Sequence, residues 1–495
     1  MAGGPRRVVV VGGGITGLVA AYRLLQTSNG TPTEITVIEA AGAPGGKLRT
    51  GELDGIPIEE GADSFVVRKP WAIELCRELG LGDDLVAPVR GGASVWARGR
   101  LVAYPKAAAF GVPASVEELL RWPGLSLRGR FRAATELFRP AGKPGDRDES
   151  IRDLAVRRLG SEAADTLVAP LLAGINAGDP AQLGVAATFP ELRTWERGHG
   201  SLIRGARAAV KRTRERNEQG DPLFATVWSG LSTIVSVLSA ALGPGRIRLG
   251  DPVSSLVRAG EGWAVEVGGE RLIADVVVLA TPAFESARLL ASAAPDAARQ
   301  LANIPYASTA VVSFVYPEGT AGLLPPGTGF IVPGIRLDPS GPTTITACTW
   351  VSSKWPREEH RGRAVLRCFV GRDGDEGSLE KDDQEIARLA RRDVEATAPL
   401  RGVPEATSVV RWPRSMPQYR VGHLDTLDGI DRALASSPGL VLAGSAYRGV
   451  GIADCVRQAG QAAERVRRHL AGPDGEVPPG SHPGEGSNVE QEAIT

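Results

Sequence analysis

Cysteine and histidine, the side chains that most often bind metals or form disulfides, are scarce in this chain. Its 495 residues include 4 cysteines and 5 histidines, without any C-x-x-C, H-x-x-H or H-E-x-x-H spacing. These absences argue against a catalytic metal and against a redox-active dithiol. We expect buried core thiols in a reducing compartment, at Cys76, Cys348, Cys368 and Cys455.

The chain also lacks an excess of charge of either sign and lacks long apolar runs. It carries 57 basic and 57 acidic residues, so its composition gives no indication of nucleic-acid binding. Residues 1–7 contain no signal-peptide core, and no apolar run approaches the roughly 18 residues of a membrane helix. We therefore expect a cytoplasmic protein.

One segment, residues 116–132, combines apolar and basic positions in a helical pattern. Two interpretations of it stay open. It could adhere to a membrane surface, which would make the protein loosely membrane-associated. The simpler interpretation, which we favour, is that its apolar side packs against the substrate-binding part of the protein.

A glycine-rich turn directly follows an apolar run near the N-terminus. Residues 8–18 read VVVVGGGITGL, with Gly12, Gly14 and Gly17 in the spacing G-x-G-x-x-G before a helix expected over about residues 14–25. The first glycine allows a tight turn, the second lets the backbone approach a pyrophosphate, and the third lets helix and strand pack closely. The helix N-terminus would offer its N–H groups to the anion.

A second expected strand, residues 34–39, ends in Glu39, about 20 residues beyond the glycines, where a carboxylate can bond a ribose hydroxyl. Strand, turn, helix and strand together predict a dinucleotide site. The plainer alternative is an ordinary βαβ unit with a glycine-rich turn. The residues expected to bind the dinucleotide are Gly12, Gly13, Gly14, Ile15, Thr16, Gly17, Glu39 and Ala40.

Two further pairs of motifs resemble the FAD signature of the flavin amine oxidase superfamily. They are APGGKLRT (43–50) with IEEGADSF (58–65), and LVLAGS (440–445) with GVGIAD (449–454). The resemblance implies that Gly46 and Lys47 approach the phosphates and ribityl chain, that Arg49 points toward the flavin, and that Val253 lies beside the adenine. It also assigns to FAD binding Gly61, Ala62, Asp63, Ser64, Trp412, Gly444, Gly449, Val450, Gly451, Ile452 and Asp454.

Other stretches narrow the resemblance to the oxygen-dependent protoporphyrinogen and coproporphyrinogen oxidases of haem synthesis. They include LLAGINAGD (171–179), ATFP (187–190), HGSL (199–202) and WPRSMPQY (412–419). TITACTW (344–350) and SKWP (353–356) are similar to the branch of Gram-positive bacteria, whose substrate is coproporphyrinogen III. The resemblance covers nearly the whole chain.

The resemblance implies an FAD-dependent enzyme that oxidises coproporphyrinogen III to coproporphyrin III, in three two-electron steps that each release hydrogen peroxide from O2. A hydride would pass from a saturated bridging carbon to flavin N5, so positioning does most of the protein's work. We therefore assign no residue with certainty as catalytic, and Asn176 or a bound water could accept the proton. A transient contact with the next enzyme of the pathway stays open.

The four propionates of coproporphyrinogen call for cationic partners. Lys69 is the first candidate, because the resemblance places it at the rim of the active site, whereas the alternative is a solvated lysine before Pro70. By the same resemblance Ile175 should lie over the macrocycle, with Gly174 leaving room for it. Protoporphyrinogen-specific relatives tend to place an arginine around Ala93, and this chain does not. The other basic candidates are Arg49, Arg68, Arg98, Arg100 and Lys106.

Three other functions remain alternatives: oxidation of protoporphyrinogen IX, a flavin amine oxidase or carotenoid desaturase with the same FAD motifs, and a flavin-binding scaffold without enzymatic activity. Basic side chains near Lys69 suit an acidic substrate better than an amine. Peroxide formation during turnover would separate an enzyme from a scaffold.

We expect an α/β fold in which a Rossmann-like FAD-binding domain is interrupted by a helical insert and by an α+β substrate-binding domain. The length of the chain alone argues for more than one domain. The expected FAD-binding parts are residues 1–91, 222–283 and 406–470. The helical insert spans 92–221, the substrate-binding sheet 284–405 and a disordered tail 471–495.

Overall fold

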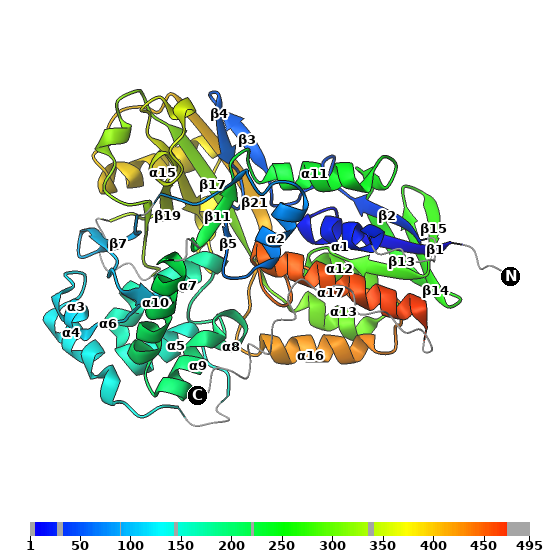
Figure 1. The fold of residues 1–495 in the computed structure, drawn as a ribbon, viewed down its shortest axis with the longest axis horizontal. Coiled ribbons are helices and arrows are strands. Elements are labelled where there is room, and N and C mark those ends of the chain that lie inside the picture. Colours follow the sequence, from blue (N-terminus) through cyan, green and yellow to red (C-terminus); the bar gives the residue numbers. More distant parts are fainter. Residues whose placement is uncertain are drawn as a thin grey trace.

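The computed structural model describes residues 5–26, 33–89, 91–142, 147–218, 222–334 and 341–472. Apart from Ala471 and Gly472, the predicted tail therefore lies outside the described residues. Figure 1 shows three parts: a parallel-sheet domain on the right, a large mixed sheet at the upper left and a helical insert at the lower left.

The parallel-sheet domain is built on five strands that all run in the same direction. Val8 and Val10 of the first strand face one side of the sheet, whereas Val9 and Val11 face the other, and all four are buried. A strand covered on both faces explains the uninterrupted valine run. The strand order is β12 (Ile247–Leu249), β2 (Thr33–Glu39), β1 (Arg6–Val11), β16 (Val276–Leu279) and β22 (Leu440–Leu442).

Helices cover one face of this sheet, and a three-stranded meander with further helices covers the other. The strands come from widely separated stretches, which confirms the expected discontinuous Rossmann-like fold. On the first face lie α1 (Ile15–Gln26), α2 (Trp71–Glu78), α11 (Ser232–Leu242) and α17 (Ile452–Ala471). The second face carries β13 (Val253–Ala259), β14 (Gly262–Val267), β15 (Glu270–Ala274), α12 (Ala283–Leu290), α13 (Pro295–Ala302) and α16 (His423–Leu434).

The mixed sheet has seven strands, and its pairs are antiparallel except where β18 meets β7. Alternate residues of its central strands pack under α15 (Asp383–Thr397) in a core that includes Cys348 and Cys368. All four cysteines are buried, as expected of core thiols. The strand order is β21 (Ala406–Pro417), β17 (Tyr306–Val315), β20 (Val365–Val370), β19 (Ile345–Trp350), β18 (Gly329–Ile331), β7 (Ser94–Ala97) and β8 (Arg100–Ala103).

The helical insert has its own core, and serine side chains cap several of its helices. Ser126 Oγ, for example, accepts a hydrogen bond of 3.0 Å from Gly129 N–H at the start of α4. Its elements are β9 (Ala108–Ala109), β10 (Val112–Pro113), α3 (Val116–Arg121), α4 (Leu127–Ala134), η1 (Thr135–Phe138), α5 (Ile151–Leu159), α6 (Ser161–Ala163), η2 (Ala164–Val168), α7 (Ala169–Asn176), α8 (Val185–Thr188), α9 (Pro190–His199) and α10 (Leu202–Glu218).

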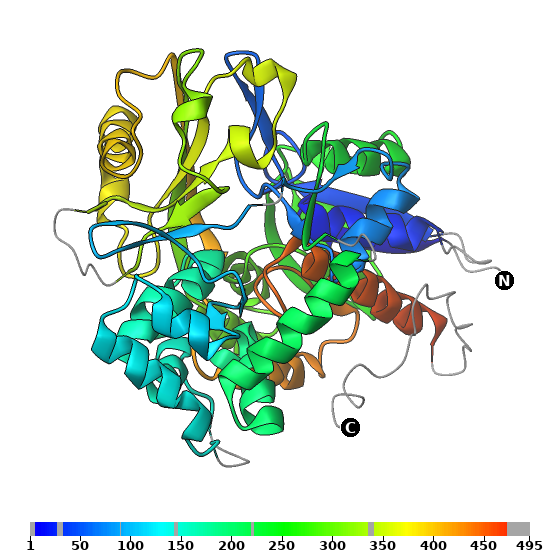
Figure 2. The same ribbon diagram turned by 60° about the vertical axis from the view of Figure 1, so that its left-hand side comes forward.

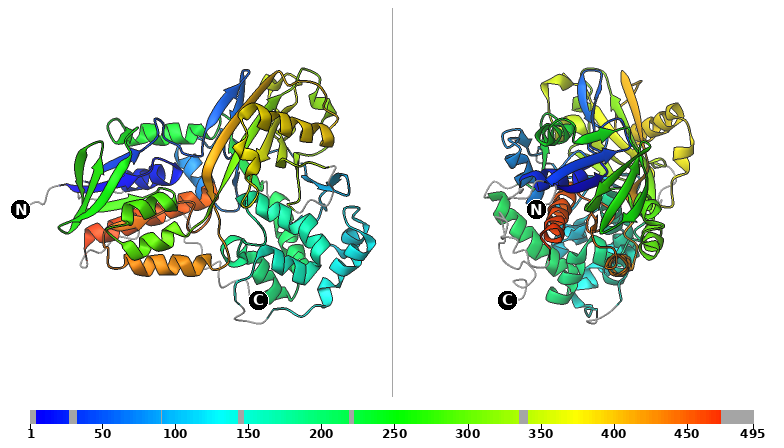
Figure 3. Two further views of the ribbon diagram at one scale, coloured as in Figure 1. Left: turned by 180° about the vertical axis from the view of Figure 1, so that it is seen from behind. Right: turned by 90° about the vertical axis from the view of Figure 1, so that its right-hand side faces the viewer.

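The three parts meet near the middle of the molecule. They are also distinct in the rear view of Figure 3, whereas in Figure 2 the insert extends in front of the parallel-sheet domain; in Figure 1 the N-terminal ends of α1 and α17 face the region where the parts meet. The remaining short elements are the hairpin of β3 (Thr50–Leu53) and β4 (Ile56–Glu59), the strands β5 (Phe65–Val66), β6 (Leu85–Val86) and β11 (Phe224–Val227), α14 (Val351–Lys354), and the short turns η3 (Ala321–Leu323), η4 (Glu358–His360) and η5 (Gly377–Glu380).

The segment 116–132 forms α3 and most of α4. Leu119 is buried, but Leu127 and Phe131 are 69% and 65% exposed. The favoured interpretation, in which the apolar side of this segment packs inward, is therefore wrong for α4. Within the described ranges, no helix has the length and apolar character needed to cross a membrane.

Candidate cofactor and substrate site

The glycine-rich turn between β1 and α1 is closely packed on one side and open on the other. A Cβ on Gly17 would lie 1.9 Å from the Gly12 carbonyl oxygen, and Gly12 itself has a φ of +105°. At Gly14 a Cβ would meet no heavy atom within 4 Å. Gly17 therefore lets α1 pack directly on the turn, whereas the backbone at Gly14 is accessible to a ligand. Ile15 and Thr16 are buried in the first turn of the helix.

The carboxylate of Glu39 lies at the end of β2, next to this turn. Its Oε2 accepts a hydrogen bond of 2.6 Å from Gly13 N–H, and its Oε1 accepts one of 2.8 Å from Ala41 N–H. The Glu39 backbone oxygen accepts from Asp251 N–H, two residues before the buried Val253. Glu39, the exposed Ala40 and Val253 thus meet at the same edge of the sheet.

The loop containing Lys47 lies on the glycine-rich turn. Gly45 N–H donates to the Gly13 carbonyl oxygen at 2.8 Å, and a Cβ on Gly46 would be 3.4 Å from Gly14 Cα. Lys47 Nζ donates to the Ser415 carbonyl oxygen at 2.6 Å and lies 3.4 Å from Ser445 Oγ. Desolvation lowers the pKa of this ammonium group, because no carboxylate in the described part of the chain lies at ion-pair distance.

The loop before α17 contributes a second open glycine. Gly444 has a φ of +138° and no heavy atom within 4 Å of a Cβ position, whereas Gly449, with a φ of +120°, is closely packed, because a Cβ there would lie 2.4 Å from Asp454 Cγ. Gly451 is the N-cap residue of α17 and is exposed, whereas Val450 is half-buried and Ile452 is buried. The N-terminus of a second helix therefore faces the same region as that of α1.

Tyr419 connects both ends of this loop. Its hydroxyl donates to the Ser445 carbonyl oxygen at 2.7 Å and accepts from Gly449 N–H at 2.9 Å. Its ring stacks on His423 with centroids 4.0 Å apart, and burial raises the pKa of the phenol, so it remains a donor. Sequence reasoning gave Tyr419 no role of its own, because nothing in the local pattern indicates these two partners.

Asp454, in the first turn of α17, holds Lys69. Lys69 Nζ donates to Asp454 Oδ1 at 2.8 Å and to Oδ2 at 2.6 Å. The Lys69 side chain is 36% exposed, whereas that of Asp454 is 10% exposed. The structure thus brings the first candidate for propionate binding to the same helix terminus as the predicted cofactor residues.

The loop from Gly61 to Ser64 packs against the Lys47 loop. A Cβ on Gly61 would lie 2.1 Å from the Lys47 carbonyl oxygen, and Trp412 Nε1 donates to the Glu60 carbonyl oxygen at 2.8 Å. Arg49 forms an ion pair with Glu60, and its guanidinium carbon lies 5.5 Å from the centroid of the Trp412 ring. Arg49 is therefore already engaged by the protein, and Ala62 is partly buried beside it in the core under α1.

Asp63 points away from the glycine-rich turn and toward the mixed sheet. Lys354 Nζ donates to its Oδ2 at 2.7 Å, Ser64 Oγ donates to its Oδ1 at 2.7 Å, and Arg367 Nη1 lies 3.5 Å from Oδ2. Burial opposes ionisation, but Lys354 and Arg367 outweigh it and hold the pKa of Asp63 well below its usual range.

The C-terminal end of α7 provides an exposed apolar side chain. Ile175 is 52% exposed, and the Cβ direction of Gly174 is open. Asn176 is buried, and its amide donates to the Leu172 carbonyl oxygen of its own helix at 3.4 Å. This placement fits Ile175 as a wall of an opening and argues against Asn176 as a proton acceptor.

The remaining basic candidates have other surroundings, including Arg68, which directly precedes Lys69 in the chain. Arg68 pairs with Glu191 at 3.1 Å, and Arg98 and Arg100 are exposed at the turn of the β7–β8 hairpin. Lys106 is also exposed. The contacts found for the described residues do not connect these four side chains to Lys69.

The arrangement fits an elongated anionic dinucleotide. Two helix N-termini and open backbone at Gly14 and Gly444 meet between the three parts of the molecule, together with Lys47, which has no carboxylate partner among the described residues. The part of the chain that the structure describes contains no cluster of His, Cys, Asp and Glu suited to a metal.

Comparison with known proteins adds the family. The model of the flavin containing amine oxidoreductases matches residues 15–467. Over 470 residues the chain is 36% identical to the coproporphyrinogen III oxidase of Bacillus subtilis, covering 92% of this chain and 97% of that protein. Over 474 residues it is 31% identical to the coproporphyrinogen III oxidase of Staphylococcus aureus, covering 94% of this chain and 100% of that protein.

Among solved structures, one similar protein comes from Exiguobacterium sp. 255-15 and is provisionally named a protoporphyrinogen oxidase. It superposes with a TM-score of 0.82 at 31% sequence identity, covering 94% of this chain and 99% of that chain. The similarity extends over all three parts of the molecule, including the helical insert and the mixed sheet.

Proposed function

The chain belongs to the flavin-containing amine oxidoreductases and, within them, to the coproporphyrinogen III oxidase family; on that premise we propose that it oxidises coproporphyrinogen III to coproporphyrin III, with FAD as cofactor and O2 as electron acceptor. One observation carries the proposal: nearly full-length similarity to proteins of that name at 36% and 31% identity. The geometry around α1 and α17 supports it. Bound FAD supplies the hydride acceptor.

We assign the cofactor residues by what each can offer. Backbone N–H groups in the first turn of α1 lack intrahelical partners and can take the pyrophosphate, because Gly14 leaves room for it. Glu39 can exchange its contact with Gly13 for a ribose hydroxyl. Lys47 brings an ammonium group that has no carboxylate partner in the described part of the chain, and the N-terminus of α17 adds a second positive dipole end.

The protein's part in the reaction is to hold a flat macrocycle and its propionates. The exposed Ile175 on α7 can form an apolar wall, and Lys69 can bind one propionate. An ammonium group has three donors, so Lys69 can keep one hydrogen bond to Asp454 while it binds a second carboxylate. Such an arrangement holds the bridging carbon against the cofactor without a dedicated acid or base.

The domain boundaries expected from the sequence are part of this proposal. We assign FAD binding to residues 1–91, 222–283 and 406–470, and substrate binding to 284–405 together with the helical insert 92–221. The cofactor contacts described above come from the first and third of the FAD-binding stretches and from the start of β13.

The test is anaerobic bleaching of the yellow protein. Purified enzyme is mixed with coproporphyrinogen III or with protoporphyrinogen IX, air is then admitted, and porphyrin fluorescence and peroxide are measured. Faster bleaching by coproporphyrinogen III, followed by coproporphyrin and peroxide, is the expected result. A flavin that stays oxidised with both porphyrinogens would contradict the proposal.

Protoporphyrinogen IX oxidation is the second candidate, and the similarity to the Exiguobacterium protein favours it. The two porphyrinogens differ in their number of propionates, so the same bleaching experiment separates them. Faster bleaching by protoporphyrinogen IX would select this candidate.

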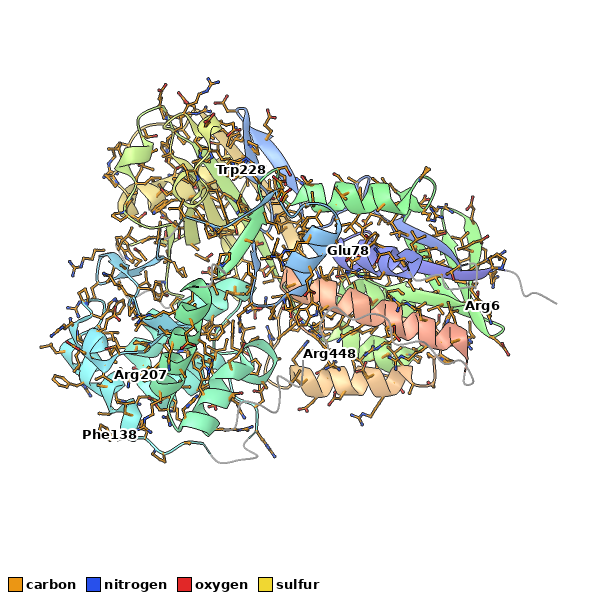
Figure 4. All side chains as sticks on the ribbon, in the orientation of Figure 1. Arg6, Glu78, Phe138, Arg207, Trp228 and Arg448 are labelled. Carbon is orange, nitrogen blue, oxygen red and sulfur yellow. The ribbon has the colours of Figure 1, made fainter. Side chains whose placement is uncertain are left out.

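We also propose a loose contact of the helical insert with a membrane surface. Leu127, Phe131 and Phe138 are 69%, 65% and 86% exposed, and Arg128 and Arg139 are exposed beside them. Figure 4 places Phe138 at the outer margin of the insert, far from the parallel sheet. Apolar side chains flanked by arginines suit an anionic lipid surface.

Sedimentation with vesicles tests this contact. We expect the protein to sediment with phosphatidylglycerol vesicles at low salt and less with phosphatidylcholine vesicles, and the F131S/F138S double variant to stay in solution. Equal sedimentation of the variant and the wild type would contradict the proposal.

A further inference from the structure

Arg367 is a buried cation on a central strand of the mixed sheet, and it reaches out of its own domain. It lies on β20 and is 1% exposed. Its Nη2 donates to the Gly61 carbonyl oxygen, and its Nη1 lies 3.5 Å from Asp63 Oδ2. Its Nε has no hydrogen-bond partner among the described residues. An unpaired buried N–H costs stability, so an arginine at this position needs a reason.

Lys354 approaches the same loop from α14. Its Nζ donates to Asp63 Oδ2 at 2.7 Å, and the side chains of both residues are less than one-fifth exposed. Two cations of the substrate-binding part thus bind one short loop of the parallel-sheet domain, the Gly61–Ser64 loop. Both the carbonyl oxygen of Gly61 and the carboxylate of Asp63 are held from that side.

The Gly61–Ser64 loop lies directly against the proposed cofactor residues. Gly61 packs so closely on the Lys47 carbonyl oxygen that a Cβ would clash, and the same Cβ would lie 3.6 Å from the Trp412 ring. Lys47 in turn contacts Ser415 and Ser445. A shift of the Gly61–Ser64 loop would therefore also displace the Lys47 loop.

The charges of this cluster do not cancel at neutral pH. Arg367 and Lys354 are cations, and Asp63 is ionised. Glu59, on β4, is the second carboxyl group near Arg367, and burial raises its pKa to about 7. The cluster therefore carries more positive than negative charge behind the Gly61 loop.

We propose that Arg367 and Lys354 are positioning residues of the flavin site, which fix the Gly61–Ser64 loop against the cofactor and stabilise the reduced flavin through their uncompensated positive charge. The inference rests on the proposed flavin chemistry. A hydride brings two electrons and one proton, so its acceptance adds one negative charge to the flavin ring. Positive charge behind the Gly61–Ser64 loop would lower the free energy of a bound flavin that has gained this charge.

The experiment compares midpoint potentials of bound flavin, measured by equilibration with a reference dye, in four variants. R367M and K354M each remove a cation, D63N removes the anion, and R367K distinguishes loss of the charge from loss of the arginine shape. We expect R367M and K354M to shift the oxidised-to-reduced ratio at fixed potential at least about tenfold toward oxidised, equivalent to about 30 mV for two electrons. D63N should shift it in the opposite direction, and R367K should stay near the wild type.

Arg363 offers a matched control. It also connects the mixed sheet to the other domain, because its Nη1 lies 2.6 Å from Asp54 Oδ2 and its side chain is only 13% exposed. It does not contact the Gly61–Ser64 loop in the described contacts. R363M should therefore keep the wild-type potential, and an equal fall in this variant would overturn a local role for Arg367.

Wild-type potentials in R367M and K354M with flavin bound would overturn the proposal. A shift of the same sign in D63N would do so too, because it would show loosening of the loop rather than an effect of charge. If R367M does not fold, K354M, R367K and D63N still give the sign test. If the variants show these shifts but the flavin of the wild type is bleached by neither porphyrinogen, the proposed substrate is refuted and the inference remains intact.

Discussion

Two buried arginines in different parts of the molecule have opposite surroundings. In the helical insert, Arg158 is fully buried and donates to Glu136, to the Pro140 carbonyl oxygen at 2.8 Å and to the Gly200 carbonyl oxygen at 2.9 Å. In the mixed sheet, Arg367 is equally buried, but its Nε has no hydrogen-bond partner among the residues that the structure describes, and its contacts cross to another domain. Arg158 therefore stabilises the domain to which it belongs. Arg367 lowers the stability of its own domain, because a buried N–H group there lacks a partner among the described residues.

The surroundings of Glu136 explain why the Arg158 pair is structural. Glu136 also accepts from Leu202 N–H at 2.8 Å and from Ser201 Oγ, so the same carboxylate caps the start of α10. Every partner belongs to the helical insert. Removing one partner of a buried, fully hydrogen-bonded ion pair strongly destabilises the protein, although the net contribution of the intact pair to the free energy of unfolding is modest.

The largest expected effect is therefore that of R158M. It leaves the carboxylate of Glu136 buried without its cation, and we expect a loss of about 3–5 kcal/mol in the free energy of unfolding. Urea denaturation followed by circular dichroism measures it, and the R158M/E136L double variant should recover part of the loss. A loss in the free energy of unfolding below about 1 kcal/mol would contradict the structural role of Arg158 and its contrast with Arg367.

The carboxyl group of Glu59, which lies near Arg367, gives a pH-dependent test of the comparison between the two arginines. Burial raises its pKa to about 7 from an ordinary 4.5, so the folded state binds this proton more tightly than the unfolded state. This carboxyl group therefore costs no stability well below pH 4.5, and its cost grows between pH 4.5 and 7 and levels off above pH 7. We expect E59Q, which cannot ionise, to be about 1–3 kcal/mol more stable than the wild type at about pH 8 and equally stable at about pH 3.5. Thermal unfolding at the two pH values tests this, and a difference that is independent of pH would contradict it.

Lys69 represents the intermediate case, an ion pair that is partly open to solvent. With 36% of its side chain exposed, it should matter little for folding. If it binds a propionate, K69A should raise the KM for coproporphyrinogen III about tenfold, while the protein retains its flavin. R98A at the β7–β8 turn is the matched control, because Arg98 has no described contact with this site. Steady-state kinetics with unchanged KM and kcat would make Lys69 a bystander.

Local chemistry made part of this structure predictable from the sequence. The spacing of Gly12, Gly14 and Gly17 follows from steric limits within one turn, and the valine run follows from a strand covered on both faces. The partners of Lys47 and Arg367 were not predictable, since Ser415 lies 368 residues and Gly61 306 residues away along the chain. The sequence likewise predicted a helix over residues 127–134, but it did not predict which side of this helix the rest of the protein covers.

The smallest expected change in stability completes the comparison. R367M replaces a buried, incompletely paired guanidinium by an apolar side chain of similar length, and Lys354 remains to pair with Asp63. Such replacements are often neutral or stabilising, so the unfolding free energy of the flavin-free protein should stay within about 1 kcal/mol of the wild type or rise. The measurement is urea denaturation of the flavin-free R367M and R158M variants side by side. Equal losses in the two would mean that Arg367 is also a structural residue, because a cation kept for the flavin should affect the cofactor far more than the fold.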